Sequence, residues 1–225
     1  MAVTVGFVIP VLNEQDRIAA LLGYLREHFP DSELTVVDGG SRDRTVAAAL
    51  PLCTRLLLGD PGRAAQMNLG GRSTNTDYLC FLHADSVPGV SAGQLQARLA
   101  SGPAWGFCRV RLSSPRPVFR VIEWFMNLRS RLTSVATGDQ MLFLERAVFE
   151  HSGGFDDIPL MEDVAYSKRL RRLAPPLVIA EPVLSSSRRW EQRGVLRTTL
   201  AMWALRLAYC AGVSPSRLWR YYYGS

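Results

Sequence analysis

Residues 1–90 alternate short apolar runs with segments of helical periodicity, and no other feature of the chain limits its fold as strongly. Apolar, β-branched runs predict strands at 3–10, 34–38, 55–59 and 77–85. Apolar residues at helical spacing predict a helix over 18–29 capped by Asn13, and two more, one starting near Ser41 or Thr45 and one at 64–72. Strand, helix and strand in succession favour parallel pairing through right-handed crossovers. The fold class is therefore α/β, with a mostly parallel central sheet flanked by helices.

The second half of the chain changes character but has the length and composition to build over the first. It predicts strands at 105–112 and 140–145, helices at 118–132 and 162–173, and a basic helix from about Gly194 to Ala211. With 225 residues and no repeat or linker, the chain can bury one sizeable core. We expect a single domain over 1–225, divided into halves at 1–90 and 91–180 and a helical C-terminal extension at 181–225.

Charge and cysteine usage narrow the class of partner. The formal net charge of +6 at pH 7 favours a partner that carries phosphate or carboxylate. The four cysteines lie far apart without a C-x-x-C pair, which indicates buried free thiols in a reducing cytoplasm. The N-terminus reads as a first strand, and the most apolar stretch, 195–213, is interrupted by Arg197 and Arg206. A leader or a membrane span is therefore not expected.

Polar side chains follow three of the predicted strands. Asn13 and Glu14 follow the first strand, Asp38 ends the second, and His83 and Asp85 end the fourth. In an open α/β sheet such residues gather at the edge where ligands bind. Clustered carboxylates repel one another and favour a hard cation, and Mg²⁺ is commonly held by one or two carboxylates plus substrate phosphates. We expect Asp85 to carry the metal.

Each of these residues also has a plainer interpretation. Asp38 precedes glycine and could simply form a turn, which is as good an account as a ligand contact. Glu14 taken alone fits a helix N-terminus better than a site. His83 taken alone is typical of a half-buried, hydrogen-bonded histidine. The functional interpretation rests on the fact that three predicted strands are each followed by polar side chains.

Several motifs in order resemble a known family. IPVLNE, VVDGGSRDRT, GRAAQMNLG and FLHADS look like the nucleotide-binding half of a family 2 glycosyltransferase with the GT-A fold, and GGFDDIPLMEDVAYSKRL resembles its acceptor half. The resemblance covers roughly residues 3 to 175. GRAAQMNLG, HADS and SSSRRW look most like the small subgroup called radical-SAM/selenodomain-associated, or arsenosugar-biosynthesis, glycosyltransferases.

The resemblance implies a UDP- or GDP-linked sugar donor bound with Mg²⁺ or Mn²⁺. The D-x-D metal motif of the family reads His83-Ala84-Asp85 here, so the metal is assigned to Asp85 and the choice of metal stays open. The residues implied to contact the nucleotide are Pro10, Asn13, Glu14, Asp38, Ser41, Asp43, Arg63, Asn68, His83 and Ala84.

The resemblance also implies catalytic and acceptor residues. Asp163 matches the catalytic base that takes the acceptor proton in inverting transfer, and Glu162 is its neighbour. An acidic helix start would explain both without catalysis. The residues implied to contact the acceptor are Gly138, Asp139, Gln140, Arg189 and Trp190, although the first three could form a tight turn and Trp190 could serve packing. Ser186 stands where polymer-forming relatives have the glutamine of Q-x-x-R-W, so a polymer synthase is not expected.

The sequence thus predicts a cytoplasmic, inverting, metal-assisted glycosyltransferase with a small acceptor, either phosphorylated or lipid-linked. A nucleotidyltransferase is a rival, but PVLNEQDR after the first strand lacks the glycine-rich basic loop that triphosphates favour. A non-catalytic protein that binds a nucleotide, RNA or an anionic membrane is a second rival. The scattered basic residues argue against nucleic acid. The arginines of the C-terminal helix could meet the inner membrane face, or form a solvated surface.

Overall fold

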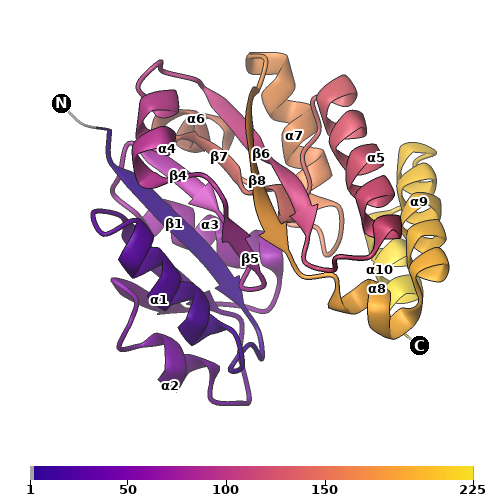
Figure 1. The fold of residues 1–225 in the computed structure, drawn as a ribbon, viewed down its shortest axis with the longest axis horizontal. Coiled ribbons are helices and arrows are strands. Elements are labelled where there is room, and N and C mark those ends of the chain that lie inside the picture. Colours follow the sequence, from indigo (N-terminus) through magenta and orange to yellow (C-terminus); the bar gives the residue numbers. More distant parts are fainter. Residues whose placement is uncertain (1–2, 225) are drawn as a thin grey trace.

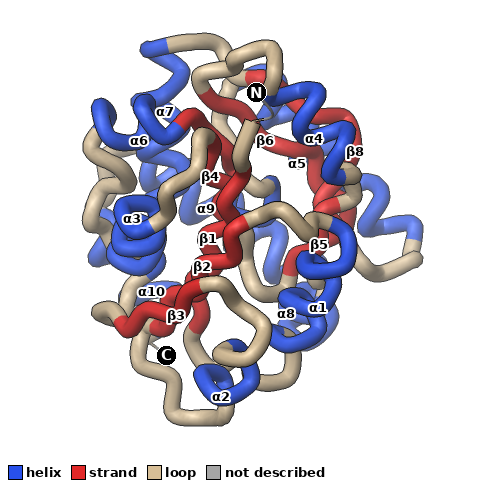
Figure 2. The backbone as a smooth tube through the Cα atoms, turned by 90° about the vertical axis from the view of Figure 1, so that its left-hand side faces the viewer, coloured by secondary structure: helices blue, strands red, loops and turns tan. Residues whose placement is uncertain are grey.

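A computed structural model describes residues 3–224 and centres on an eight-stranded sheet of order β3-β2-β1-β4-β7-β6-β8-β5. The strands run through the middle of the molecule with helices on both sides (Figure 2). The first part of the chain contributes β1 (Val5–Val11), α1 (Ile18–His28), β2 (Glu33–Asp38), α2 (Thr45–Ala49), β3 (Arg55–Leu58), α3 (Arg63–Ser73) and β4 (Tyr78–Phe81). β1 pairs in parallel with β2 and β4, and β2 with β3, as the alternation predicted.

Alternating side chains of β1 fill the two layers of the core. Phe7, Ile9 and Val11 face the layer that contains α1, α2 and α4, whereas Val8 faces the layer that contains α3, α6 and α7. All four side chains are buried. A strand buried on both faces reads as a continuous apolar run, which explains the pattern seen in the sequence.

The second half extends the sheet with mixed pairing. It contributes β5 (Ser86–Pro88), α4 (Ala92–Leu99), β6 (Trp105–Leu112), α5 (Pro117–Thr133), a 3₁₀ turn η1 (Gly138–Gln140), β7 (Leu142–Glu145), α6 (Arg146–Ser152), α7 (Glu162–Leu173) and β8 (Leu177–Ser185). β7 is antiparallel to β4 and β6, β8 is parallel to β6, and β5 is antiparallel to β8. The fold class expected from the sequence is confirmed.

Three local expectations were wrong. The strand expected to reach Asp85 ends at Phe81, because the chain reverses in a turn closed by the Ser86 amide and the His83 carbonyl. β8 was not expected, because Glu181 and Pro182 interrupt its apolar pattern; a bulge opposite Cys108 to Val110 accommodates them. Asn13 does not cap α1, whose N-cap is Arg17 without a side-chain bond.

The C-terminal extension consists of α8 (Arg188–Arg193), α9 (Val195–Cys210) and α10 (Pro215–Tyr223), and α9 confirms the predicted basic helix. α5 and α9 lie side by side at one end of the molecule, with α8 and α10 near their base (Figure 1). β8 crosses the boundary expected at residue 181, so the sheet joins the extension to the rest of the chain. Within residues 3–224, no helix combines the length and apolar character that crossing a bilayer requires.

Candidate functional site

The loops after β1 and β2 are joined by hydrogen bonds into one rim of the site. Asn13, with φ 56°, donates its backbone N–H to Ser41 Oγ and accepts the Arg42 N–H at its Oδ1, each at 2.8 Å. The Glu14 amide donates to Thr45 Oγ1 at 2.7 Å. These bonds bring together loop residues that lie about thirty positions apart, as expected for the carboxyl ends of neighbouring parallel strands.

Two acids of this rim have defined local roles. Asp43 accepts the Thr45 amide at 2.9 Å; desolvation works against its ionised form, but hydrogen bonds from Thr45 and the Gln15 amide lower the pKa of Asp43. Glu14 pairs with Arg17 at 2.7 Å. Asp43 therefore needs no metal ion to stay ionised.

Asp38 is buried at the end of β2 with one oxygen satisfied and the other free. Its Oδ2 accepts the Gly40 and Ser41 amides, each at 2.9 Å, which is the turn predicted for Asp-Gly. Its Oδ1 is buried and has no hydrogen-bond partner among the residues that the structure describes. A lone buried carboxylate oxygen costs free energy unless a donor reaches it, so this atom marks a place for a ligand N–H.

Gln66 holds the two strand ends together, and sequence analysis missed it. Its Nε2 donates to the Val11 carbonyl at 2.8 Å and to the Val37 carbonyl at 2.7 Å, across β1 and β2. An added Cβ on Gly39 would touch the Gln66 side chain, so the loop after β2 packs directly on it. A glutamine directly after two alanines and before a methionine in the predicted helix is the signal that could have identified this residue.

Three residues expected at the nucleotide are placed differently. Asn68 is buried, and its amide exchanges two 2.8 Å hydrogen bonds with the backbone of Phe155, so it holds the segment before α7 instead of facing a ligand. Pro10 is buried within β1, and Ala84 belongs to the core layer beside α1. Arg63, in contrast, is exposed at the start of α3 and turns its charge toward the acids described next.

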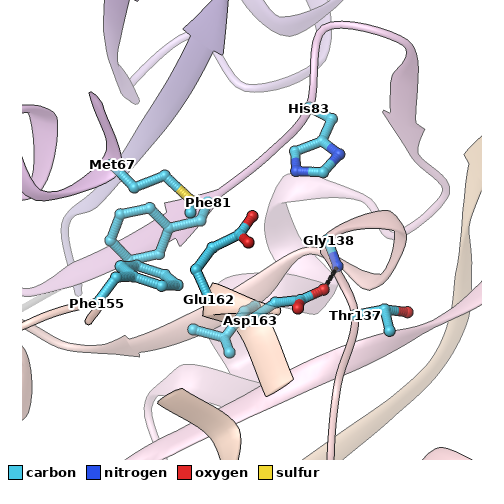
Figure 3. Close-up of a pocket in the computed structure, with 9 residues that line it drawn as sticks. Met67, Phe81, His83, Thr137, Gly138, Phe155, Glu162 and Asp163 are labelled. Atoms are coloured by element: carbon cyan, nitrogen blue, oxygen red, sulfur yellow. Dashed lines mark hydrogen bonds between the residues drawn. The ribbon is translucent and has the colours of Figure 1, made fainter. Parts of the chain in front are cut away.

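Glu162 and Asp163 begin α7 and line a small pocket with Met67, Phe81 and His83. Their carboxylates lie below the imidazole of His83, and Asp163 points to the Gly138 amide (Figure 3). Gly138 N–H donates to Asp163 Oδ2 and Val164 N–H to its Oδ1, each at 2.7 Å. The 3₁₀ turn η1 therefore fixes the orientation of Asp163.

Burial and mutual repulsion make this acidic pair reluctant to ionise. Burial, then the charge of Asp163, raises the pKa of Glu162 to about 7, against the pull of Arg63. Burial also raises the pKa of Asp163, although the two backbone N–H groups and the charges of Arg63 and Arg129 oppose the change. A carboxylate in such surroundings takes up a proton more readily than one in water, which suits a general base.

A second acidic pair lies across the site and is linked by two hydroxyl groups. Ser86 Oγ contacts Asp85 Oδ1 and Ser185 Oγ, each at 3.4 Å, and Ser185 Oγ donates to Asp139 Oδ1 at 3.2 Å. Burial, and next the charge of Asp85, raises the pKa of Asp139. Sequence analysis missed Ser185, because the pairing of β5 with β8 brings it here.

His83 is uncharged in this setting. Burial, helped by the charges of Arg63 and Arg189, lowers the pKa of His83 to about 3. Its ring packs on the backbone of Gly138, where an added Cβ would overlap the imidazole. Glycine is thus required at position 138 for His83 and the turn to approach each other. A neutral imidazole can accept a hydrogen bond or bind a metal ion.

The donor set fits a hard divalent cation that arrives with its substrate. Among residues 3–224, no three His, Cys, Asp or Glu side chains are already grouped as a metal site. Asp85 and Asp139 nevertheless form a repelling carboxylate pair that a cation would relieve. Two carboxylates with ligand phosphates and water are the usual donors of Mg²⁺, and Mn²⁺ accepts the same oxygen ligands.

The residues expected at the acceptor divide into two groups. Gly138 lines the acidic pocket, and Asp139 belongs to the second acidic pair with Asp85. Gln140 is fully buried, and its Oε1 accepts from Ser130 Oγ at 2.7 Å, so its side chain supports the turn. Trp190 is 5% exposed and packs on Leu112 and Phe119, which is the packing alternative.

Arg189 is exposed, and its charge reaches His83 from the C-terminal extension. Its Nη1 donates to the Tyr222 hydroxyl at 3.1 Å, which links α8 to α10. Tyr222 also lies beneath the guanidinium, with the ring centroid at 5.6 Å. The extension therefore contributes a cation to the site, beside Arg63.

Three solved structures share this fold at low sequence identity. S. aureus TarS 1–349 in complex with UDP aligns with a TM-score of 0.67 and 15% identity, over 81% of this chain and 60% of that one. Mannosyltransferase PcManGT from Pyrobaculum calidifontis in complex with GDP-Man and Mn²⁺ aligns with a TM-score of 0.63 and 22% identity, over 92% and 61%.

The third structure is glucosyl-3-phosphoglycerate synthase from Mycobacterium tuberculosis in complex with Mn²⁺, UDP and phosphoglyceric acid. It aligns with a TM-score of 0.62 and 17% identity, over 94% of this chain and 79% of that one. The chain spans about 60% of the length of the first two structures. No curated protein sequence matches it. The sequence profile of Glycosyl transferase family 2 matches residues 7–144, more than half of the chain, so the protein belongs to glycosyl transferase family 2.

Proposed function

We propose that this protein is an inverting glycosyltransferase that moves a sugar from a UDP- or GDP-linked donor to a small acceptor, with a divalent cation. One observation carries the proposal: Glu162 and Asp163, an acidic pair with raised pKa values, lie close enough to a second carboxylate pair, Asp85 and Asp139, for the charge of Asp163 to act on Asp139, and two arginines act on the same site. The GT-A neighbours that hold UDP, or GDP-Man with Mn²⁺, support this choice of donor.

The donor would bind along the rim formed by the loops after β1 and β2. Asp38 Oδ1, buried without a partner among the described residues, would accept an N–H of the base after a small opening of its turn. Asn13, Glu14, Ser41 and Asp43 would border the nucleoside. Arg63 at the N-terminus of α3 would bind the diphosphate, where a helix end and a cation both favour negative charge.

Asp85 and Asp139 would hold Mg²⁺ or Mn²⁺ together with the donor diphosphate, and neutral His83 would lie beside them. When bound, the cation supplies positive charge that stabilises the departing nucleoside diphosphate. Arg63 and Arg189 would add to the same stabilisation from the protein. Phosphate oxygens of the substrate would supply the metal ligands that these side chains do not provide.

Asp163 would act as the general base. The acceptor oxygen bonds to the anomeric carbon while the bond from that carbon to the phosphate oxygen breaks, and the nucleoside diphosphate leaves with the electron pair. The acceptor proton passes to a carboxylate oxygen of Asp163, which the Gly138 and Val164 amides hold in place. Attack opposite the leaving group inverts the anomeric carbon. Burial keeps the pKa of Asp163 raised, and the charge of Asp163 in turn helps to raise the pKa of Glu162.

The proposal also covers the subgroup of the protein, its acceptor and its location in the cell. We place the chain in the radical-SAM/selenodomain-associated subgroup on GRAAQMNLG, HADS and SSSRRW. The acceptor is a small molecule, phosphorylated or lipid-linked. The protein works in the cytoplasm, and its basic α9 contacts the inner membrane face peripherally.

A thermal-shift screen of UDP, GDP and their sugars, with and without Mn²⁺, tests the donor. A nucleoside triphosphate that stabilises the protein more than every nucleotide sugar would favour a nucleotidyltransferase instead. Salt-sensitive RNA binding that ignores UDP and Mn²⁺ would favour a non-catalytic protein. With the donor known, the anomeric configuration of the product, read by NMR, tests inversion.

Exchange of Asp163 for asparagine tests the base. Turnover should fall by about 10² to 10⁴-fold, because a general base contributes about that much, while donor binding persists. Glu150→Gln is the matched control, since Glu150 lies exposed on α6 and pairs with Arg146. Unchanged turnover in Asp163→Asn would refute the assigned role.

A further inference from the structure

A cavity of about 600 Å³ lies between α5 and α9, outside the acidic pocket. Its walls are mostly apolar, with Ile122, Phe125 and Leu128 from α5 and Met202, Trp203 and Leu207 from α9. Sites of this size commonly take drug-sized ligands. The cavity opens at a rim where large apolar side chains are exposed, including Leu132 at 74% and Leu207 at 70%. Water contact at such a rim is unfavourable, so a ligand that covers it would gain free energy.

This α5–α9 cavity adjoins the acidic pocket. Thr137 lines both, and the neighbouring Gly138 bonds to Asp163. A molecule that fills the cavity can therefore extend past Thr137 to the proposed base.

Arg129 stands at this junction. It lines the cavity, and its charge acts on Asp163 and Asp139. Its Nη2 bonds to Ser130 Oγ at 2.7 Å, whereas its Nε is buried without a partner among the described residues. The cavity is thus apolar at its rim and carries polar groups at the end nearest Asp163.

We propose that the acceptor is an amphiphile, with its hydroxyl-bearing head beside Asp163 and its apolar chain between α5 and α9. This inference rests on the proposed function and names its acceptor class. The head would pass Thr137, where Arg129 can donate a hydrogen bond to it. The head hydroxyl gives its oxygen to the anomeric carbon and its proton to Asp163, and the nucleoside diphosphate departs. The apolar chain takes no part in the reaction and supplies binding energy.

The shared lining residue Thr137 favours an acceptor chain over a second copy of the protein. A partner surface laid over the rim would cover exposed leucines but would leave the inner end, at Thr137 and Arg129, unused. A flexible apolar chain fills both the rim and the interior.

Binding of methyl and octyl β-D-glucoside, below the micelle concentration, tests the proposal by isothermal titration calorimetry. Each methylene that leaves water should improve affinity about fourfold, so octyl glucoside should bind at least about a hundredfold more tightly than methyl glucoside. Leu207→Asp should lower this ratio of affinities at least about tenfold. Leu196→Asp is the matched control on α9, because Leu196 is 72% exposed and lies outside the cavity lining.

UDP and GDP binding is measured on the same unmodified protein. If the protein bound a nucleotide but had the same affinity for both glucosides, the inference would be overturned and the proposed function would stand. The same holds if Leu207→Asp and Leu196→Asp lost affinity for octyl glucoside equally. A chain-length effect without any nucleotide binding would overturn the proposed function and, with it, the acceptor role of the cavity. A dimer that Leu207→Asp dissociates, together with equal affinity for both glucosides, would assign the cavity to self-association.

Discussion

Glu162 and Asp163 are neighbours in the chain, yet their surroundings give them different tasks. Asp163 is oriented by two backbone N–H groups. The pKa of Glu162 is instead set by burial, by the charge of Asp163 and by the opposing charge of Arg63. Asp163 is therefore held in one orientation, and its charge is part of what raises the pKa of Glu162. This division gives a pH dependence that can be measured without knowing either substrate.

We expect Glu162→Gln to stabilise the metal-free protein at high pH. The pKa of Glu162 is about 7 in the folded state and 4.5 ordinarily, so between these values the folded protein holds more protons than the unfolded chain. Its contribution to stability is present below pH 4.5 and is lost as the pH rises through 7. Removing the charge should therefore raise the free energy of unfolding at pH 8, relative to the wild type, by up to about 3 kcal/mol more than at pH 4.5.

Urea unfolding at both pH values measures that difference. Comparison with the wild type at each pH cancels the opposing effect of His83, whose low pKa destabilises the folded state below about pH 6.5. An equal effect of the substitution at both pH values would contradict the raised pKa.

Asp85→Asn should uncouple nucleotide binding from metal. With one carboxylate left to begin the donor set, Mn²⁺ should no longer raise the melting temperature of the UDP- or GDP-bound protein. Asp31→Asn, before β2 at the opposite edge of the sheet, serves as the control and should keep the Mn²⁺ effect. The metal assignment fails if the two variants respond to Mn²⁺ alike.

At the scale of elements, close contact between β6 and β8 fixes the second half of the sheet. Gly106 on β6 pairs with Leu177 on β8, and an added Cβ would overlap the Leu177 carbonyl oxygen and the ring of Phe143. The strand can only approach its neighbours here without a side chain. The same pairing carries Ser185 to the acidic pair.

Gly106→Ala should accordingly lower the free energy of unfolding by about 1–3 kcal/mol, as overpacking does. Gly23→Ala provides the contrast, because Gly23 lies within α1 and its added Cβ would meet nothing within 4 Å. That variant should gain about 1 kcal/mol from helix propensity. Chemical denaturation of both variants gives the sign of each change, and a gain at both sites would mean that the lost freedom of the unfolded chain outweighs the contacts at Gly106.

Sequence patterns predicted elements where burial is uniform and failed where pairing is non-local. The β1, β2 and β3 runs are continuous and were found, whereas β8 was hidden by Glu181 and Pro182, and β5 consists of three residues. The site followed the same rule. Motifs selected Asp38, Asp85 and Asp163 as candidates, whereas Gln66, Arg129 and Ser185 lie beside them through packing that no local pattern records.

At the scale of the whole molecule, the α5, α9 and α10 end combines exposed apolar and basic residues. Trp124 is 57% and Trp203 52% exposed, and Arg193 and Arg197 lie exposed nearby in the sequence. Aromatic rings with arginines are typical of surfaces that lie at a membrane interface. This is the end that carries the mouth of the α5–α9 cavity.

We expect the protein to sediment with vesicles that contain anionic lipid and to be released by high salt, because surface charge is screened within a few ångströms in molar salt. Leu200→Asp should weaken binding, since it places a negative charge on the apolar part of α9. Leu58→Asp on β3, also strongly exposed, is the control. Equal sedimentation of both variants, or none of the wild type, would exclude this contact.

The pairing of Ser86 with Ser185 also bears on how the protein is made. Residues 5–81 can assemble their parallel strands early during synthesis, but the turn with Asp85 gains its partner strand only when residue 185 has left the ribosome. Contacts this distant in sequence form late in folding. An unfinished or truncated chain would thus carry the joined loops after β1 and β2 without the pairing of Asp85 and Asp139, and under the proposed function it could hold a donor without consuming it.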